Sequence, residues 1–398
     1  MATLIKLEEP RRLVANPPGF ALWELGFRPF YLLASTFAAL SIALWALQFS
    51  GMLGHSYLSA PIWHAHEMLF GFALAVVVGF LLTAGKSWSG QPTPTGLPLM
   101  ALATLWVLGR VLVLTRFGWV AALTNAAFPL AAAFALGRSL VKGGSRRNYF
   151  FIVLLVAMSI AEMAIHLSQL GAAPAMGWIG VQVGLDVLLF IISVMTGRVM
   201  PMFTNNGVLG AKAVSRPWVN ATASGAILLL LAGDIVQANA VVIIVIAVCG
   251  AAAQLLRCLL WKPWKTWRQP IVWVLHVACL WIPLHLALRA AAQVGWVPAS
   301  LATHALTVGA AGGLIIAMMT RTARGHTARP LKADRWDVAI YALVLISAPV
   351  RVLLPWVAPS MALHAVLCAA VLWSAGFGLY AVRYWPVLTR PRLDGRPG

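Results

Sequence analysis

Long apolar runs, each close to 20 residues, follow one another along the sequence. A helix needs about 20 mainly apolar residues to cross the hydrocarbon core of a bilayer. Turn-forming residues such as Gly143-Gly144-Ser145, Asn205-Asn206-Gly207 and Lys262-Pro263 separate the runs. The pattern predicts an all-α, polytopic transmembrane bundle of about 12 helices. The expected spans are 29–49, 64–85, 97–115, 119–140, 149–170, 178–200, 217–236, 239–261, 271–292, 300–320, 337–357 and 361–383.

The gaps between these runs are too short to hold a soluble domain. We therefore expect one membrane domain over 29–383, preceded by a cytoplasmic segment, 1–28, and followed by a cytoplasmic tail, 384–398. The segment from Met1 to Phe20 is charged and contains proline, without an apolar stretch before a cleavage site. It is not expected to be a signal peptide.

Basic residues alternate between successive connections. Lysine and arginine accumulate in the cytoplasmic loops of membrane proteins. One set of connections is rich in them, for example within 138–147, 257–268 and 321–335. The alternate set holds little besides Arg116, Arg289 and Arg351. An even number of helices with both termini in the cytoplasm satisfies this distribution.

Composition supports a membrane protein. The 398 residues are 61% hydrophobic and 10% charged, with a mean hydropathy of +0.86, whereas soluble domains carry about 25% charged residues. The net charge of +19 falls in short clusters between apolar segments, which topology explains better than a nucleic-acid partner. Four cysteines stand singly in apolar runs without CxxC spacing, so we expect buried packing residues: Cys249, Cys258, Cys279 and Cys368.

Six histidines are predicted to lie in the outer half of the membrane, on five different helices. An ionisable side chain there costs roughly 2.5–3.5 kcal/mol, so it tends to face the bundle interior and to have a partner. Neutral imidazole is the usual axial ligand of haem and also binds copper. The layer predicts a haem or metal site, although each imidazole could instead bond a nearby carbonyl or water. Its members are His64, His66, His166, His285, His304 and His364.

Two of these histidines occupy matching positions. His66 precedes Gly71 by the same spacing as His304 precedes Gly309, in the second and tenth predicted helices. We therefore expect His66 and His304 to be haem ligands. His64 lies two residues from His66, which corresponds to about 200° of rotation on a helix, so one can serve a cofactor while the other meets a second site or water.

The other histidines have alternative assignments. His64 and His285 are candidates for either haem or copper, and His166 and His364 are candidates for copper.

Two glutamates accompany the histidines and are the candidate catalytic residues. His64, Glu67 and Met68 share one helix face, and Glu162 lies one turn before His166. Carboxylates at these positions could fix an imidazole tautomer or supply protons. A plain intramembrane hydrogen bond is the alternative for Glu162.

Two further features have more than one interpretation. Gly309 and Gly313 form a GxxxG motif, which indicates close helix packing or a smooth surface for a flat porphyrin. Asp186, in the sixth helix, is either a proton relay or a structural acid with a partner.

Four motifs of the sequence are distinctive when taken together: Glu24-Leu25-Gly26-Phe27-Arg28-Pro29-Phe30, Trp63-His64-Ala65-His66-Glu67-Met68, Arg198-Val199-Met200-Pro201-Met202-Phe203-Thr204-Asn205-Asn206 and Met319-Thr320-Arg321-Thr322-Ala323-Arg324-Gly325-His326. Through these motifs the sequence resembles the NnrS family over essentially its whole length. The resemblance implies a multi-pass protein of the bacterial inner membrane that contains haem b and copper and acts in the response to nitric oxide and nitrosative stress. Nitric oxide is then the expected ligand, with an electron donor still to be identified.

Two functions remain open from the sequence. The first is protection against nitric oxide at a histidine-ligated metal site, with redox turnover that would make the protein an oxidoreductase. The second is transport of a small molecule or metal ion, with the histidines as a substrate or proton path. A membrane sensor is a weaker third hypothesis, because the sequence carries no appended soluble signalling domain.

Overall fold

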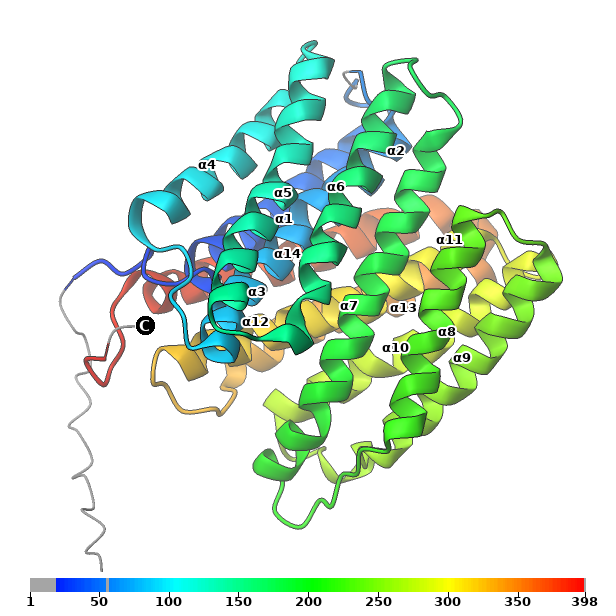
Figure 1. Cartoon of the computed structure of the whole chain (residues 1–398). Helices are drawn as coiled ribbons and strands as arrows, with labels where there is room; N and C mark the ends of the chain where they lie inside the picture. The colour runs from blue at the N-terminus through cyan, green and yellow to red at the C-terminus, as the bar shows by residue number, and fades with distance from the viewer. Residues whose placement is uncertain (1–18, 55–56, 397–398) are drawn as a thin grey trace, which may run out of the picture.

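The computed structural model describes residues 19–54 and 57–396, and within them the chain forms helices and no strands (Figure 1). Among the described residues, eleven helices are long and apolar enough to cross a membrane, and a twelfth, α4 (Gly96–Leu112), has 17 residues. The predicted all-α bundle of about 12 transmembrane helices is confirmed. The orientation with both termini in the cytoplasm stays a prediction. His55 and residues 1–18, which include most of the segment examined for a signal peptide, lie outside the described residues.

Several helices are longer than the apolar runs that predict them. α7 runs through the expected turn at 205–207, so that turn prediction is wrong, and α14 reaches Thr389, beyond the expected end at 383. The remaining elements are α1 (Phe27–Phe49), α2 (Ala60–His66), η1 (Glu67–Ala73), α3 (Leu74–Ser89), α5 (Gly118–Lys142), η2 (Arg146–Asn148), α6 (Phe150–Gln169), α7 (Met176–Gly207), α8 (Pro217–Ile235), α9 (Ala240–Leu260), η3 (Pro263–Lys265), α10 (Pro270–Gln293), α11 (Ala299–His304), η4 (Ala305–Gly312), α12 (Gly313–His326), α13 (Arg335–Val357), η5 (Pro359–Met361) and α14 (Ala362–Thr389).

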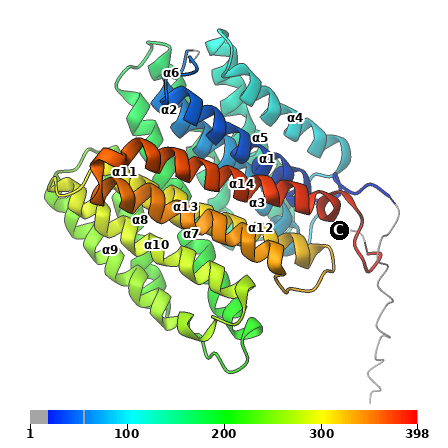
Figure 2. The same cartoon turned by 180° about the vertical axis from the view of Figure 1, so that it is seen from behind.

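Two continuous helical rods form the centre of the bundle. The rod of α2, η1 and α3 has 83% of its most apolar window buried, and the rod of α11, η4 and α12 has 72%, against 33–61% for the other spans. The remaining helices surround them, and α1 and α14 lie side by side although they come from opposite ends of the chain (Figure 2). The two helices that carry the predicted haem ligands are therefore the most enclosed ones.

Each central rod contains a π-helical segment at a matching place. η1 begins directly after His66, and η4 begins directly after His304. A π-helix widens the turn, and such segments occur frequently at functional sites. The similarity between the two rods therefore extends from the sequence to the backbone.

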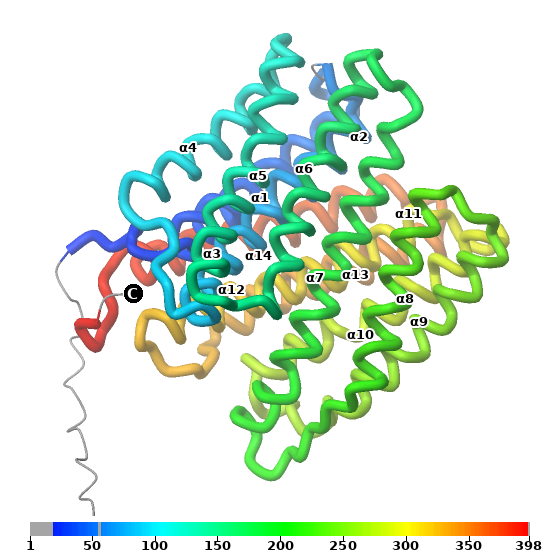
Figure 3. Tube along the Cα trace, in the orientation of Figure 1, coloured from blue at the N-terminus to red at the C-terminus, as the bar shows by residue number. Residues whose placement is uncertain are grey.

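The two ends of the described chain meet at one end of the bundle (Figure 3). The Ala21 amide donates a hydrogen bond to the Thr389 carbonyl at 2.7 Å, and the Leu393 amide donates to the Thr327 carbonyl at 3.2 Å. The Arg28 guanidinium donates to the Leu388 carbonyl at 3.0 Å. An even number of crossings accounts for this meeting, because it returns the chain to the side where it began.

Half of the cysteine prediction is wrong. Cys258 and Cys279 are buried, but Cys249 and Cys368 are exposed on the surface of the protein. In a membrane helix, apolar side chains face lipid as readily as protein, so hydropathy does not distinguish the two environments.

Candidate functional site

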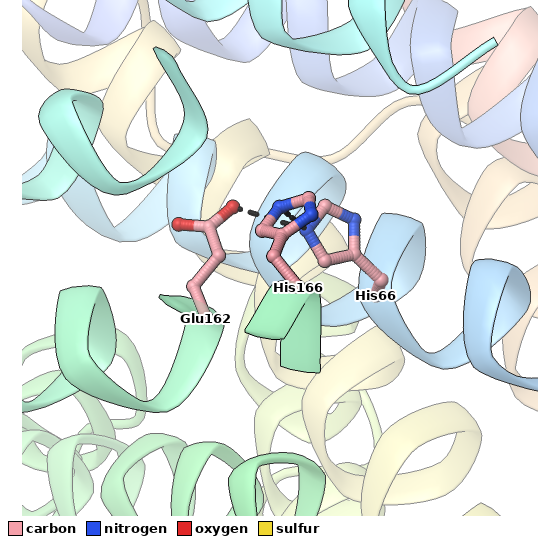
Figure 4. Close-up of side chains that lie close together, drawn as sticks. All are labelled: His66, Glu162 and His166. Atoms are coloured by element: carbon pink, nitrogen blue, oxygen red, sulfur yellow. Dashed lines mark hydrogen bonds and ion pairs between the residues drawn. The ribbon is translucent and has the colours of Figure 1, made fainter. Parts of the chain in front are cut away.

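Two histidines and a glutamate form a buried cluster at the end of the bundle where α2 meets α6 (Figure 4). His66 Nε2 lies 3.1 Å from His166 Nε2 and 3.3 Å from Glu162 Oε1. Glu162 and His166 stand one turn apart on α6, so both side chains reach the same point. The three potential ligand atoms lie within 4.8 Å of one another, and none of the residues is more than 1% exposed.

The second nitrogen of each imidazole is held by a neighbour. His66 Nδ1 lies 2.7 Å from Glu67 Oε1, and His166 Nδ1 lies 2.8 Å from the Tyr57 hydroxyl. Burial, reinforced by the negative charge of Glu67, raises the pKa of Tyr57 well above its usual value, so this phenol stays protonated. Partners of this kind fix the tautomer and orientation of metal-binding histidines. Both Nε2 atoms are thus directed to one point.

Arg110 brings positive charge into the cluster from the short helix α4. Its guanidinium lies 2.6 Å from Glu67 Oε1 and 3.7 Å from Glu162 Oε1, and it also donates to Asn125 Oδ1. Two carboxylates and one guanidinium leave a formal charge of −1, counting the imidazoles as neutral. An unbalanced charge is costly in a low-dielectric interior, so one added cation is favoured. A proton on an imidazole or a monovalent metal ion satisfies this requirement.

The cluster also has unused ligand atoms. Glu67 Oε2 and Glu162 Oε2 are buried and have no hydrogen-bond partner among the described residues. Buried polar atoms are nearly always paired, so two such oxygens beside converging imidazoles need a partner. Two nitrogens bound at about 2 Å to one ion in tetrahedral geometry lie about 3.3 Å apart, close to the observed 3.1 Å. The residues fit a metal ion.

The helix α4 is docked onto η1 by close backbone contact. The Trp106 indole N–H donates to the Gly71 carbonyl at 2.9 Å. A Cβ atom at Gly71 would stand 2.7 Å from the Phe37 ring and 2.8 Å from the Arg110 guanidinium. Glycine at this position therefore lets Arg110 approach the cluster.

A separate cavity of about 680 Å³ lies between the two central rods and α7, α13 and α14. His64 and His304 both line it, with ring centroids 6.3 Å apart and planes within 12° of parallel. His304 Nδ1 lies 2.6 Å from the Ser300 carbonyl, so Nδ1 carries the proton and Nε2 keeps its lone pair. Trp45 stacks on His64 with centroids 4.5 Å apart, which holds that ring in place.

The cavity fits a haem by size and by donor chemistry. Cofactor pockets commonly measure about 300–1,000 Å³ and are mainly apolar, and this cavity is walled by side chains such as Phe72, Trp178 and Trp373. The imidazoles of His64 and His304 line the same cavity with ring centroids 6.3 Å apart, so both can reach one bound group.

The structure separates the two histidines that the helix similarity had paired. His66 lies in the buried cluster with His166 and Glu162, whereas His304 faces His64 in the cavity. His64 and His66 point into different surroundings, as their spacing on the helix predicts, and the group that each of them serves stays a prediction.

The other two predicted histidines lie in neither group. His285 Nδ1 is 2.8 Å from the Ala302 carbonyl, and its Nε2 has no partner among the described residues. His364 is exposed.

The structure favours a structural role for Asp186 over a proton relay. It favours close helix packing over a porphyrin-binding surface for the GxxxG motif. Asp186 Oδ1 lies 2.8 Å from the Arg289 guanidinium, which also pairs with Asp234. A Cβ at Gly309 would overlap the Trp281 ring of α10, and one at Gly313 would stand 2.7 Å from Ala278 of the same helix. The motif therefore serves close helix packing.

Three functional side chains were not predicted: Tyr57, Arg110 and Asn125. Arg110 carried a signal that could have been used, because an arginine inside an apolar run is expensive without a buried anion. Tyr57 and Asn125 carried none.

A family model described as NnrS protein matches residues 21–392, nearly the whole chain. No curated protein matches the sequence.

Proposed function

This chain belongs to the NnrS family, and we propose that it is a haem- and copper-binding protein of the bacterial inner membrane that protects cells against nitric oxide. The observation that carries the proposal is the pairing of His64 and His304 across the cavity between the two central rods. The family match supports a role connected with nitric oxide.

In this proposal His64 and His304 hold the haem. Ferrous haem supplies a binding site for nitric oxide, a ligand that also binds cuprous copper. The Ser300 carbonyl fixes the tautomer of His304, and Trp45 fixes the ring of His64. Nitric oxide is small and uncharged and partitions into membranes, so an apolar cavity inside the bundle admits it without a polar channel.

His66, His166 and Glu162 hold the copper in this proposal. Imidazole nitrogens suit copper, and a cuprous ion would bring the formal charge of the cluster from −1 to zero. Glu67 and Tyr57 keep both imidazoles directed at one point, and Arg110 holds Glu67 in place at 2.6 Å.

Redox turnover of nitric oxide belongs to the same proposal and gives the two glutamates their role. Reduction of nitric oxide consumes protons, and Glu67 Oε2 and Glu162 Oε2 are buried atoms that can hold one. The electron donor remains to be identified.

Growth under a nitric oxide donor tests the proposed function. A strain that lacks the protein should grow more slowly than one that carries it, and neither His304→Ala nor His166→Ala should restore growth. His364→Ala is the matched control, because His364 is exposed and lies outside both sites. All variants must reach equal abundance in the membrane.

Full restoration by both site variants would contradict the proposal. The transport hypothesis, in which the histidines form a substrate or proton path, would then take its place. Metal analysis of the purified protein separates the two directly, because transport needs no resident haem.

A further inference from the structure

The cavity contains an arginine with no anionic partner. Arg351, on α13, lines the cavity, and no described residue forms an ion pair or hydrogen bond with its guanidinium. Other arginines within the bundle have partners among the described residues: Arg110 contacts Glu67 and Asn125, and Arg257 donates to Ser193 and Thr196. Arg321 lies over the Phe203 ring. A cation inside a membrane bundle normally has a partner. A ligand bound in the cavity can therefore supply the partner that Arg351 lacks among the described residues.

Charge is unevenly distributed around the cavity wall. Apart from its two histidines, Arg351 and Asp234 are the ionisable residues among those that line it. Asp234 shares Arg289 with Asp186, so the guanidinium on that side is already paired. An anionic group on a ligand therefore finds a cation without a partner at Arg351 and none near Asp234.

We propose that Arg351 binds a carboxylate of the ligand in this cavity, and the proposed function, on which this inference rests, makes that carboxylate a haem propionate. A guanidinium presents a planar fork that matches a carboxylate with two parallel hydrogen bonds. Arg351 lines the same cavity as His64 and His304, the two proposed iron ligands. Arg351 thus positions the haem and sets which way it enters the cavity.

Titration with two ligands tests this role by binding, without any measurement of activity. Protein produced without haem is titrated in detergent with haem and with haem dimethyl ester, in which both propionates are blocked. The native protein should bind haem on the order of ten-fold more tightly than the ester, the usual effect of losing a charge-assisted hydrogen bond. Arg351→Gln should remove this preference by weakening haem binding alone. Arg351→Lys, which keeps the charge and loses the fork, should keep part of it.

Arg116→Gln is the matched control. Arg116 is an exposed arginine of the same predicted set of loops and lies outside the cavity, so this variant should behave as the native chain does. Equal affinity of the native protein for haem and its ester would overturn the inference without requiring a variant that folds. A native-like preference in Arg351→Gln would overturn it as well. Failure of the native protein to bind either ligand would overturn the proposed function instead.

Discussion

Replacing Arg110 with Gln removes the cation that two buried carboxylates share. Glu67 Oε1 lies 2.6 Å and Glu162 Oε1 3.7 Å from the guanidinium, and both glutamates are 1% exposed. Opposite charges about 4 Å apart attract by about 4 kcal/mol at an effective dielectric constant of about 20. Removing one partner of a buried ion pair typically costs about 3–5 kcal/mol. The formal charge of the cluster would change from −1 to −2, so we expect a loss of stability of about 3–5 kcal/mol.

Unfolding of metal-free protein in detergent, followed by tryptophan fluorescence, measures this loss. The double variant Glu67→Gln/Arg110→Gln restores the native charge of −1 and should recover at least half of it. Arg116→Gln, at an exposed position, should stay within about 0.5 kcal/mol of the native protein. The reasoning is refuted if Arg110→Gln unfolds like the native chain. A double variant as unstable as the single one would show that shape, not charge, is what matters.

Three further predictions follow from the structure. Tyr57→Phe and Glu67→Gln should each lower the affinity for copper by about 10–100-fold, because they release the orienting contact on a metal-binding imidazole; competition with a chelator measures this, and unchanged affinity would argue against a metal at the cluster. Gly309→Ala should destabilise the protein by about 1–3 kcal/mol, since its Cβ overlaps Trp281. Gly225→Ala, where a Cβ meets open space, should not lower the unfolding midpoint, and equal midpoints for the two variants would contradict the packing argument. A fluorescent reporter that works only in the cytoplasm should be active when fused at Gly398, and one active only after export would place the C-terminus on the other side.

The number of helices could be predicted from the sequence, because the bilayer imposes a minimum length on every apolar run. The positions of the helix ends were predicted less accurately than the number of helices. The segment Asn205-Asn206-Gly207 has the composition of a turn, yet it forms the last turn of α7. The Asn205 side chain accepts a hydrogen bond from the Ala213 amide at 2.8 Å, a contact with the following loop that local composition does not reveal.

The depth of the site histidines in the membrane could be predicted from the sequence. The direction in which each side chain points from its helix could not. Loop charge placed His64, His66, His166 and His304 at one level, and the structure brings all four into the two sites. Which histidines face each other depends on how α2, α6 and α11 are turned, and the π-helical segments change that rotation. The rotation of about 200° between His64 and His66 predicts from the sequence that their side chains point in different directions. The residue that faces His304 could be identified only in the structure.

The reduced-minus-oxidised absorption spectrum of three purified alanine variants tests the haem assignment most directly. His64→Ala and His304→Ala should each lose haem or shift its Soret and alpha bands. His285→Ala should keep the native spectrum, because His285 is buried but lies outside the cavity, with its Nδ1 held by the Ala302 carbonyl. A native spectrum and native haem content in both cavity variants would contradict the account.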